Sequence, residues 1–389
     1  MLAANINDYR TLAKRRLPRF MFEYIDGGAF AEATLRRNVS DFEELPLKQR
    51  ILDGVGETDI KTTLFGQNYS MPVTLAPIGL AGLNARRGEI QAVRAAQAAG
   101  VPFILSTMSV CTMEEIRKKT DPIWFQLYVM RDRGFMKAMI ERAKASGCTA
   151  LIFTVDMPVP GIRYRDMRSG LSAGGPIARR VKRFSQVLAR PGWAWDVGLL
   201  GGPHTLGHVS SAIGKRAGVE EFWAWASRNF DPTVTWKDIA AIRALWDGPL
   251  IIKGILDPDD ARAAADVGVE GIIVSNHGGR QLDGALSSIR ALPSIAKAVG
   301  DRTTVLMDGG IRTGADIVRA LCMGAKGVLI GRAWVWALAA RGEAGVAHVL
   351  QILEKEMRVA MALTGAARIS DLGPGRLDLR SLRELGFGN

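Results

Sequence analysis

The chain has 389 residues, is 48% hydrophobic and carries a formal net charge of +12. That length can bury one large core or two ordinary ones, and the composition excludes an intrinsically disordered protein. No uncharged apolar run approaches the roughly 20 residues that cross a bilayer, so the sequence predicts no membrane span. The three cysteines, Cys111, Cys148 and Cys322, are widely spaced and are expected to be reduced core residues.

Residues 1–70 are expected to form helices that pack on the main domain. Beyond them, eight short apolar runs rich in β-branched residues predict strands. These strands are expected at 73–76, 102–106, 123–128, 150–155, 249–254, 271–275, 303–308 and 327–331. Helices are expected at 88–99, 135–146, 236–246, 258–267, 288–299 and 314–323, and a long final helix at 344–364.

Eight strands that alternate with helices favour one parallel (β/α)8 barrel, the TIM barrel, over two domains. An open doubly wound sheet is the alternative, but such a sheet usually has fewer strands and a glycine-rich first turn. We therefore expect residues 1–389 to form a single α/β barrel domain with an N-terminal helical extension.

The long gap after the fourth predicted strand breaks this alternation and holds an insertion at about 161–230. An insertion after a barrel strand lies at the C-terminal face of the barrel, beside the active site. Residues 161–216 include ten basic and two acidic residues, together with Trp193 and Trp195. Basic residues among tryptophans favour an anionic membrane surface; a nucleic-acid patch and a merely solvated loop are the alternatives. We expect the membrane surface and no nucleic acid.

The run Ser-Asn-His-Gly-Gly-Arg-Gln-Leu-Asp-Gly at 275–284 follows the sixth predicted strand. It places His277 and Arg280 at a strand end, where barrel enzymes carry catalytic groups. Histidine moves protons near neutral pH, and arginine grips a carboxylate through two parallel hydrogen bonds. The pair therefore predicts a site that binds a small acid and removes a proton from it. Asp156, at the fourth strand end, is expected to orient His277, although a loop cap explains that residue alone equally well.

Glycine-rich turns follow the seventh and eighth predicted strands, at 308–312 and 331–332. In barrels of this kind, the backbone N–H groups of such turns bind phosphate. Lys253 lies on the otherwise apolar fifth strand, and a buried lysine needs a partner or a task. A Schiff base would make the protein an aldolase of phosphorylated sugars. Stabilising negative charge on a reduced flavin would in addition explain the phosphate site and the His–Arg pair.

These motifs resemble those of the FMN-dependent L-2-hydroxy acid dehydrogenases and oxidases, and the resemblance covers nearly the whole chain. Besides the 275–284 run, it includes the runs that begin Tyr24-Ile-Asp-Gly-Gly-Ala, Leu75-Ala-Pro-Ile-Gly, Trp124-Phe-Gln-Leu-Tyr, Thr154-Val-Asp-Met-Pro and Met307-Asp-Gly-Gly-Ile-Arg. Within the family, the chain is most similar to the bacterial membrane-associated L-lactate dehydrogenases. The similarity to this branch rests on the runs Asp132-Arg-Gly-Phe-Met, Phe230-Asp-Pro, Lys253-Gly-Ile-Leu-Asp-Pro and Glu354-Lys-Glu-Met-Arg-Val-Ala-Met.

The resemblance implies an enzyme that oxidises L-lactate to pyruvate with FMN as its cofactor. His277 would be the catalytic base, with Asp156 beside it. The substrate-binding residues would be Tyr24, Tyr128, Arg163 and Arg280. The cofactor-binding residues would be Ala76, Pro77, Ser106, Gln126, Thr154, Lys253, Asp308, Gly309, Gly310, Arg312, Gly331 and Arg332, and no metal is expected.

The resemblance leaves the side chain of the substrate open, because plant glycolate-type relatives have an aromatic residue where this chain has Met108. Oxidation of (S)-mandelate or of another L-2-hydroxy acid is therefore the alternative activity. The membrane-associated branch implies a quinone or cytochrome acceptor in the respiratory chain and a peripheral place on the cytoplasmic face of the bacterial inner membrane. We also expect a homo-oligomer.

Overall fold

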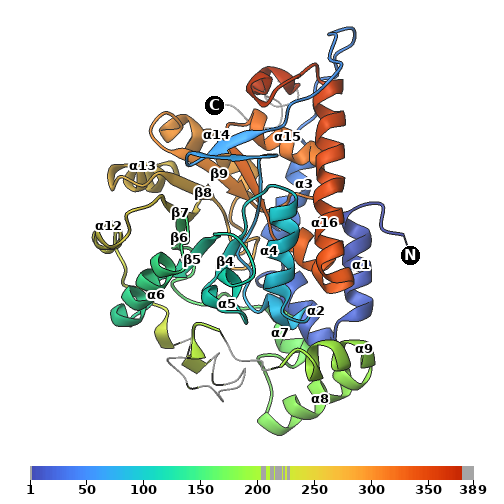
Figure 1. Ribbon diagram of the computed structural model, residues 1–389, viewed down its shortest axis with the longest axis vertical. Helices are drawn as coiled ribbons and strands as arrows, with labels where there is room; N and C mark the ends of the chain where they lie inside the picture. Colours follow the sequence, from blue (N-terminus) through green and yellow to red (C-terminus); the bar gives the residue numbers. More distant parts are fainter. Residues whose placement is uncertain are drawn as a thin grey trace.

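The computed structural model describes residues 2–202, 207–210, 214, 221, 224–225 and 228–378. Its central sheet has eight parallel strands in the order β3-β10-β9-β8-β7-β6-β5-β4. The strands are β3 (Val73–Leu75), β4 (Ile104–Ser106), β5 (Trp124–Tyr128), β6 (Ala150–Thr154), β7 (Leu250–Ile255), β8 (Gly271–Val274), β9 (Thr304–Asp308) and β10 (Gly327–Ile330). A parallel bridge between Leu75 and Phe103 joins β3 to β4 and closes the barrel (Figure 1). The predicted (β/α)8 barrel is confirmed, and the open sheet is excluded.

Helices surround the barrel, as the sequence predicts. They are α4 (Gly88–Ala98), α5 (Met113–Arg117), α6 (Arg133–Ala145), α12 (Trp236–Leu245), α13 (Pro258–Asp266), α14 (Ser288–Val299), α15 (Gly314–Cys322) and α16 (Arg332–Leu363). The range of α16 covers two helices that meet at Arg341 and Gly342, whose backbone angles are not helical, and the second of them is the predicted final helix at 344–364. Short 3-10 turns lie at η1 (Ala81–Leu83), η3 (Ile369–Asp371) and η4 (Pro374–Arg376).

The N-terminal extension is helical only up to Glu43. It contains α1 (Ile6–Arg16), α2 (Arg19–Asp26) and α3 (Ala33–Glu43). The expectation of helices up to residue 70 is wrong beyond this point, because β1 (Thr62–Leu64) and β2 (Gln67–Tyr69) form an antiparallel hairpin. Phe65 and Gly66 make its two-residue turn with φ of 51° and 78°, the left-handed geometry that matches the twist of paired strands.

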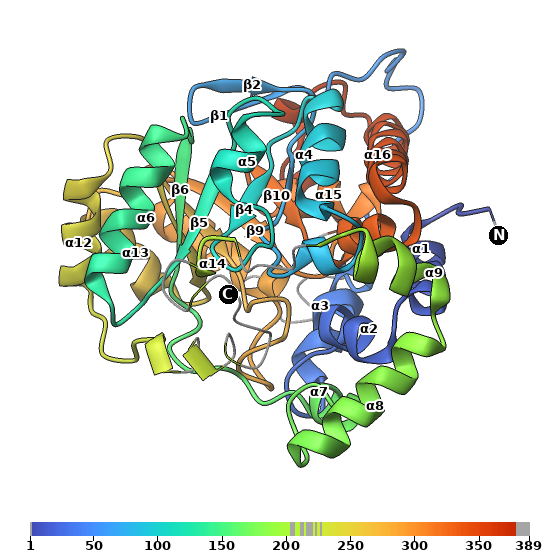
Figure 2. The ribbon, with the colours of Figure 1, turned by 60° about the horizontal axis from the view of Figure 1, so that its bottom comes forward.

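The hairpin closes the N-terminal end of the barrel. The rings of Phe65 and Tyr69 pack edge-on against Trp124, at centroid distances of 5.6 and 6.3 Å. Trp124 belongs to the apolar interior of the barrel, together with inward-facing residues such as Ile152 and Ile251. Figure 2 shows the hairpin at the top and the insertion helices α7 and α8 at the bottom. A binding site must therefore open at the opposite, C-terminal end.

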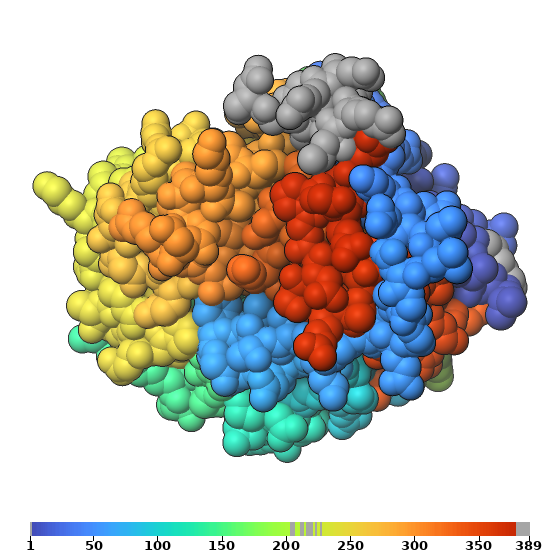
Figure 3. Space-filling view, turned by 90° about the horizontal axis from the view of Figure 1, so that it is seen from above, coloured from blue at the N-terminus to red at the C-terminus, as the bar shows by residue number. Residues whose placement is uncertain are grey.

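Near the hairpin, the segment that precedes β1 lies against the C-terminal end of α16 and the residues that follow it. Backbone hydrogen bonds link Arg50 to Leu363 (2.9 Å) and Asp59 to Ala367 (2.8 Å). In Figure 3, the C-terminal half of α16 (red) accordingly lies beside the segment that precedes β1 (blue).

The insertion between β6 and α12 carries short helices of its own. These are α7 (Tyr164–Ser169), α8 (Pro176–Leu188), α9 (Pro191–Trp193) and a π-helical turn η2 (Ala194–Leu199). The amide N–H of Phe20 in α2 donates to Gln186 Oε1 in α8 (2.8 Å), and Trp193 Nε1 donates to the Leu83 carbonyl (2.9 Å). Part of the insertion is thus fastened to the N-terminal helices and to η1.

Candidate active site

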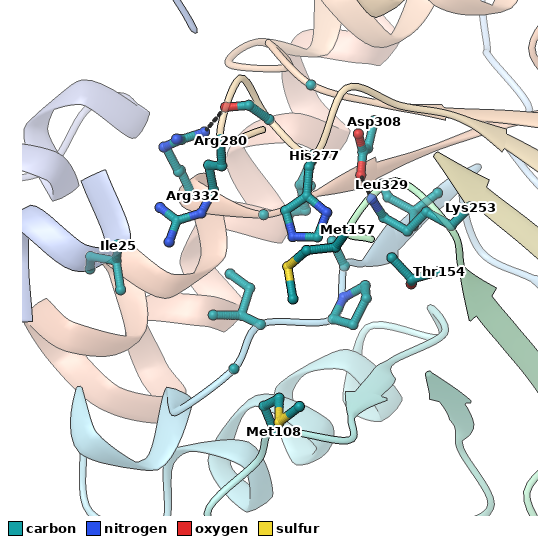
Figure 4. A pocket seen from close by; sticks show the side chains of 18 of the residues that line it. Ile25, Met108, Thr154, Met157, Lys253, His277, Arg280, Asp308, Leu329 and Arg332 are labelled. Carbon is teal, nitrogen blue, oxygen red and sulfur yellow. Dashed lines mark hydrogen bonds and ion pairs between the residues drawn. The ribbon is translucent and has the colours of Figure 1, made fainter. Parts of the chain in front are cut away.

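A pocket opens at the carboxyl ends of the strands, and each of the eight strands or the loop behind it contributes to the wall. Fifteen predicted site residues line it: Tyr24, Ala76, Pro77, Tyr128, Thr154, Arg163, Lys253, His277, Arg280, Asp308, Gly309, Gly310, Arg312, Gly331 and Arg332. The other three, Ser106, Gln126 and Asp156, do not line the pocket. In Figure 4, His277 stands in the middle, with Arg280 and Arg332 to one side and Lys253 and Thr154 to the other.

The backbone of His277 is held in a left-handed conformation. Its φ is 57°, and Gly278 and Gly279 follow with φ of 65° and 72°. Such a conformation costs a residue with a Cβ on the order of 1 kcal/mol or more, and it persists where surrounding contacts enforce it. Ser275 supplies one of these contacts, because its Oγ accepts hydrogen bonds from the His277 amide (3.0 Å) and from Lys253 Nζ (2.7 Å).

His277 is oriented by a carboxylate, as the sequence predicts. Its Nδ1 lies 2.7 Å from Asp156 Oδ1, and the Tyr128 ring lies nearly parallel to the imidazole at 6.5 Å. Burial would raise the pKa of Asp156, but the charges of His277 and Lys253 hold it below its usual value. An ionised Asp156 fixes the proton of the imidazole on Nδ1, which leaves Nε2 as the atom able to accept another proton.

Lys253 is a charged residue with its own counter-ion. Its Nζ lies 2.8 Å from Asp308 Oδ2, and the side chains of both residues are buried. Burial lowers the pKa of Lys253, but Asp308 and Asp156 more than offset this and raise it. A lysine that forms a Schiff base needs a lowered pKa, so this geometry favours a fixed positive charge over the aldolase hypothesis.

Two arginines and a tyrosine gather at one side of the pocket. The guanidinium carbons of Arg163 and Arg280 lie 5.9 and 5.2 Å from the centre of the Tyr24 ring. Arg163 Nε pairs with Asp166 (2.7 Å), whereas Arg280 donates to the carbonyls of Tyr24 (2.6 Å) and Gly27 (2.9 Å). Burial, together with the charge of Arg163, lowers the pKa of Arg280 to about 10. An anion bound between these arginines would relieve that unfavourable charge.

Arg312 and Arg332 form a second positive end beside the glycine turns. Arg332 donates to the carbonyls of Asp26, Gly27 and Gly278, and Arg312 lies 4.9 Å from the ring centre of Trp336. Neither makes an ion pair within the described part of the chain. Burial lowers the pKa of Arg312 to about 10 and, with Arg280 and Arg312 nearby, that of Arg332 to about 9. This end is built for an anion such as a phosphate.

The FMN implied by the resemblance fits the remaining features. Buried polar atoms without a hydrogen-bond partner in the described chain include Gln126 Nε2, Thr154 Oγ1 and Asp308 Oδ1. Ser106 Oγ lies 3.1 Å from Gln126 Oε1, which leaves the Gln126 amide nitrogen as a donor for a ligand. A planar heteroaromatic ring with carbonyl and N–H groups, joined through a polyol to a phosphate, would satisfy these atoms and the two arginines.

Several wall residues are not predicted from the sequence, among them Ile25, Ile78, Met157 and Phe230. Phe230 comes from the far end of the insertion, where an antiparallel bridge joins it to Met130. Its ring packs edge-on against Tyr128 at 5.6 Å. An isolated apolar residue in a loop gives no periodic signal, so sequence reasoning misses it.

The basic residues of the insertion divide into two groups. Arg163 lines the pocket, and Arg165 is used inside the protein, where it pairs with Glu23 and with the buried Asp26 (2.7 Å). Helix α8 carries the second group: Arg179, Arg180, Lys182 and Arg183. No residue of α8 is buried, and its apolar residues Ile177, Val181, Phe184 and Leu188 are 63–79% exposed. Lys215, Arg216 and Trp223 lie outside the described residues.

His208 is a buried residue of the insertion. Its Nε2 accepts from the Met113 amide (2.9 Å), and its Nδ1 lies 3.3 Å from Ser109 Oγ. Burial lowers its pKa to about 4. His204 falls outside the described residues, and within them no group of potential metal ligands gathers. None of the described helices has the length and apolar character of a membrane span.

Comparison with known proteins gives one consistent result. The family model described as FMN-dependent dehydrogenase matches residues 13–379. An L-lactate dehydrogenase of Caulobacter sp. (strain K31) is 59% identical over 96% of this chain and 97% of its own length. An L-lactate dehydrogenase of Pseudomonas aeruginosa (strain LESB58) is 57% identical over 99% of this chain and all of its own length. Among solved structures, the monotopic membrane protein (S)-mandelate dehydrogenase superposes with a TM-score of 0.90 at 35% identity, over 97% of this chain and 100% of that one.

Proposed function

The chain belongs to the FMN-dependent dehydrogenase family, and on that premise we propose that it oxidises L-lactate to pyruvate and passes the electrons to the membrane respiratory chain. The observation that carries the proposal is the meeting of the His277–Asp156 pair with Arg163 and Arg280 in one pocket. That arrangement can hold a carboxylate and remove a proton from the carbon or hydroxyl next to it.

Each side chain has a distinct task in this proposal. Arg280 and Arg163 hold the substrate carboxylate, with Tyr24 between them. The held substrate presents its C2 and hydroxyl to His277, whose Nε2 takes the proton while Asp156 stabilises the resulting imidazolium. Tyr128 stays protonated because burial, with Tyr24 and Asp156, raises its pKa, so it can donate a hydrogen bond to the substrate.

The cofactor supplies a two-electron acceptor when it is bound. We assign its ring and polyol to Ala76, Pro77, Thr154 and Lys253, which line the pocket. We also assign them to Ser106 and Gln126, which do not line it but leave the Gln126 amide nitrogen as a donor. Its polyol and phosphate end is assigned to Asp308, Gly309, Gly310, Arg312, Gly331 and Arg332. Gly310 has no room for a side chain, since a Cβ there would lie 1.7 Å from the Asn38 carbonyl.

An absorbance experiment tests the activity and its substrate. The purified protein should be yellow and should bleach under anaerobic conditions when L-lactate is added. (S)-Mandelate serves as the comparison substrate, because the structural similarity to (S)-mandelate dehydrogenase favours it as the second candidate. Faster bleaching by L-lactate supports the proposal, faster bleaching by (S)-mandelate would replace it with the alternative, and no bleaching by either would overturn both.

Electron transfer to a membrane acceptor, a quinone or a cytochrome, is proposed from the exposed face of α8. Ile177, Val181, Phe184 and Leu188 recur at positions i, i+4, i+7 and i+11 and so form one apolar stripe. Four basic residues share this helix, and each Lys or Arg near an anionic lipid surface contributes about 1 kcal/mol. In this proposal, residues 1–389 form one domain, and the insertion at 161–230 holds it peripherally on the cytoplasmic face of the inner membrane.

Vesicle binding tests that attachment. A double substitution, Val181→Ser with Phe184→Ser, should release the protein from sedimenting anionic phospholipid vesicles while anaerobic reduction by L-lactate is kept. The matched control is Val359→Ser with Leu363→Ser, which alters two exposed apolar residues of α16. Equal vesicle binding by both double variants would contradict the role of α8.

A further inference from the structure

The root of the insertion is a segment without helix or strand that nevertheless carries two site residues. Residues 155–163 lie between β6 and α7, and they include Asp156, which orients His277, and Arg163, which faces Tyr24. Strand ladders hold Asp308 and Lys253 in place. The segment itself is anchored through its backbone near its two ends, where the Val155 amide donates to the Lys253 carbonyl (2.9 Å) and the Phe30 amide donates to the Ile162 carbonyl (2.9 Å). A contact to the residues between these anchors would fix the distance between Asp156 and Arg163.

Gln281 makes that contact. Its Nε2 donates to the carbonyls of Asp156 (3.0 Å) and Val159 (2.9 Å), and its Oε1 accepts from the Gly161 amide (3.0 Å). One side-chain amide thus uses both donors and its acceptor on three backbone groups of the same segment. Gln281 follows Arg280 directly, so the β8 loop and the insertion root are joined beside the carboxylate-binding arginines.

The two loops also touch through their backbones. A Cβ at Gly161 would lie 2.3 Å from the Arg280 carbonyl, so only glycine permits this approach. The approach brings the Gly161 amide within reach of Gln281, two residues before Arg163. The Gln281 side chain is partly exposed, and its hydrogen bonds go to backbone groups rather than to the side chains of His277 or Arg163.

We propose that Gln281 is a positioning residue, which holds the insertion root so that Asp156 faces His277 while Arg163 faces Arg280. The proposal rests on the proposed function and deepens it. Misplacement of a reacting group by about 1 Å can cost on the order of 100-fold in rate. Loss of three backbone hydrogen bonds at an otherwise irregular segment permits a shift of that size.

The test compares two glutamines of similar burial. Gln281→Met removes the amide and keeps the side-chain length. Gln186→Met is the matched control, because Gln186 also makes hydrogen bonds with both ends of its amide, to Phe20 of α2 (2.8 Å) and to Ser169 of the insertion (2.9 Å). Flavin absorbance and thermal unfolding show that each holoenzyme is folded and loaded. If Gln281→Met fails to fold, Gln281→Glu replaces it, since a carboxylate keeps the acceptor for Gly161 and loses both donors.

Three measurements separate positioning from general loosening. In the Gln281 variant, the rate constant of anaerobic flavin reduction by L-lactate should fall about 10- to 100-fold, against less than threefold in the control. The pH profile of its kcat/KM should differ from that of the wild type and of the control, because Asp156 no longer holds the His277 ring in place. Oxalate serves as a carboxylate ligand, and its Kd is measured from the change that it causes in the flavin spectrum. This Kd should rise in the variant, because Arg163 is displaced.

Unchanged reduction, pH profile and oxalate binding in the Gln281 variant would overturn the proposal, as would equal losses in the Gln186 control. If the wild-type protein binds oxalate but is not reduced by any L-2-hydroxy acid, the proposed function fails. The oxalate affinities of the two variants then still decide whether Gln281 positions Arg163.

Discussion

The two ends of the pocket both contain buried charges, but they balance them differently. At the catalytic end, His277 and Lys253 each have a carboxylate within 2.7 to 2.8 Å. At the proposed phosphate end, Arg312 and Arg332 have carbonyls and an aromatic ring as neighbours, and neither forms an ion pair in the part of the chain that the structure describes. His277 and Lys253 are thus balanced within the protein, whereas Arg312 and Arg332, like Arg280 beside Arg163, carry charges that an anionic ligand would balance.

The two kinds of buried charge should therefore have different roles. Paired charges stabilise the fold, whereas unpaired cations are available to bind an anionic ligand. Removing one partner of a buried ion pair leaves an uncompensated charge and is costly. Removing an uncompensated cation should change the free energy of unfolding little, but it should weaken the binding of an anionic ligand strongly. Substitutions at the two ends should therefore have opposite effects on stability and on cofactor binding.

The largest effect is expected for His277→Ala. Loss of a general base lowers a rate by about 10²- to 10⁴-fold, so anaerobic bleaching by L-lactate should slow by that factor or become undetectable. The variant should stay yellow, because His277 is the proposed base and not a cofactor-binding residue. Unchanged bleaching in a stopped-flow experiment would refute this assignment.

Lys253→Met should strongly destabilise the protein even without cofactor. It leaves Asp308 buried without its cation, and breaking such a pair typically costs about 3–5 kcal/mol. Urea denaturation of cofactor-stripped protein measures the loss. A stability equal to that of the stripped wild type would show that the catalytic end is not balanced by this pair.

His208 provides a third case, a buried group that makes hydrogen bonds with the uncharged Ser109 hydroxyl and Met113 amide. Its pKa of about 4 in the folded protein lies below the value of 6.5 usual for histidine. The unfolded chain therefore binds a proton first as pH falls. The stabilisation is complete above pH 6.5 and is lost between pH 6.5 and 4, by about 3 kcal/mol at most, since one pKa unit corresponds to ~1.4 kcal/mol.

The comparison variant for His208 is His208→Gln, whose amide oxygen can still accept from Met113. Other groups titrate over the same range in both proteins, so the difference between the two unfolding free energies isolates His208. That difference should change between pH 6.5 and 4. A constant difference would mean that His208 is not buried in its neutral form.

The smallest effect is expected for Arg312→Leu. Loss of one charged hydrogen bond to a phosphate costs about 1.5–3 kcal/mol, so the Kd for FMN should rise by at least tenfold. The Tm of the cofactor-free variant should equal or exceed that of the cofactor-free wild type, since the substitution removes an unbalanced buried charge. A large fall in the Tm of the cofactor-free variant would show that Arg312 stabilises the fold, and the two ends of the pocket would then not differ in this respect.

The parts of the fold that are predictable from the sequence have local signals. Each barrel strand is an apolar run set off by turn residues, and most strand ends carry a polar residue of the predicted site, such as Thr154 or Asp308. The hairpin is missed because its strands are only three residues long and its turn, Phe65-Gly66, is not one of the common Asn-Gly or Asp-Gly pairs.

Other features depend on what lies far away in the sequence. Arg165 counts as part of a basic surface until the fold brings it to Asp26, a partner 139 positions earlier. The apolar stripe of α8 has the period of an ordinary core-facing helix, and only the fold shows that its residues are exposed in the described structure. Gln281 looks like a polar loop residue until the insertion root is placed against it.

The barrel is closed unevenly around its circumference. Neighbouring strands pair over three to five residues everywhere except between β3 and β4, which meet through the single bridge of Leu75 and Phe103. This seam is where the barrel wall should part with the least work, and its amides should exchange with solvent before those of other strands. Ala76 and Pro77, at one side of the seam, line the pocket, as does Met108 on the other. A molecule bound there would contact both sides of the seam and should therefore slow its local opening.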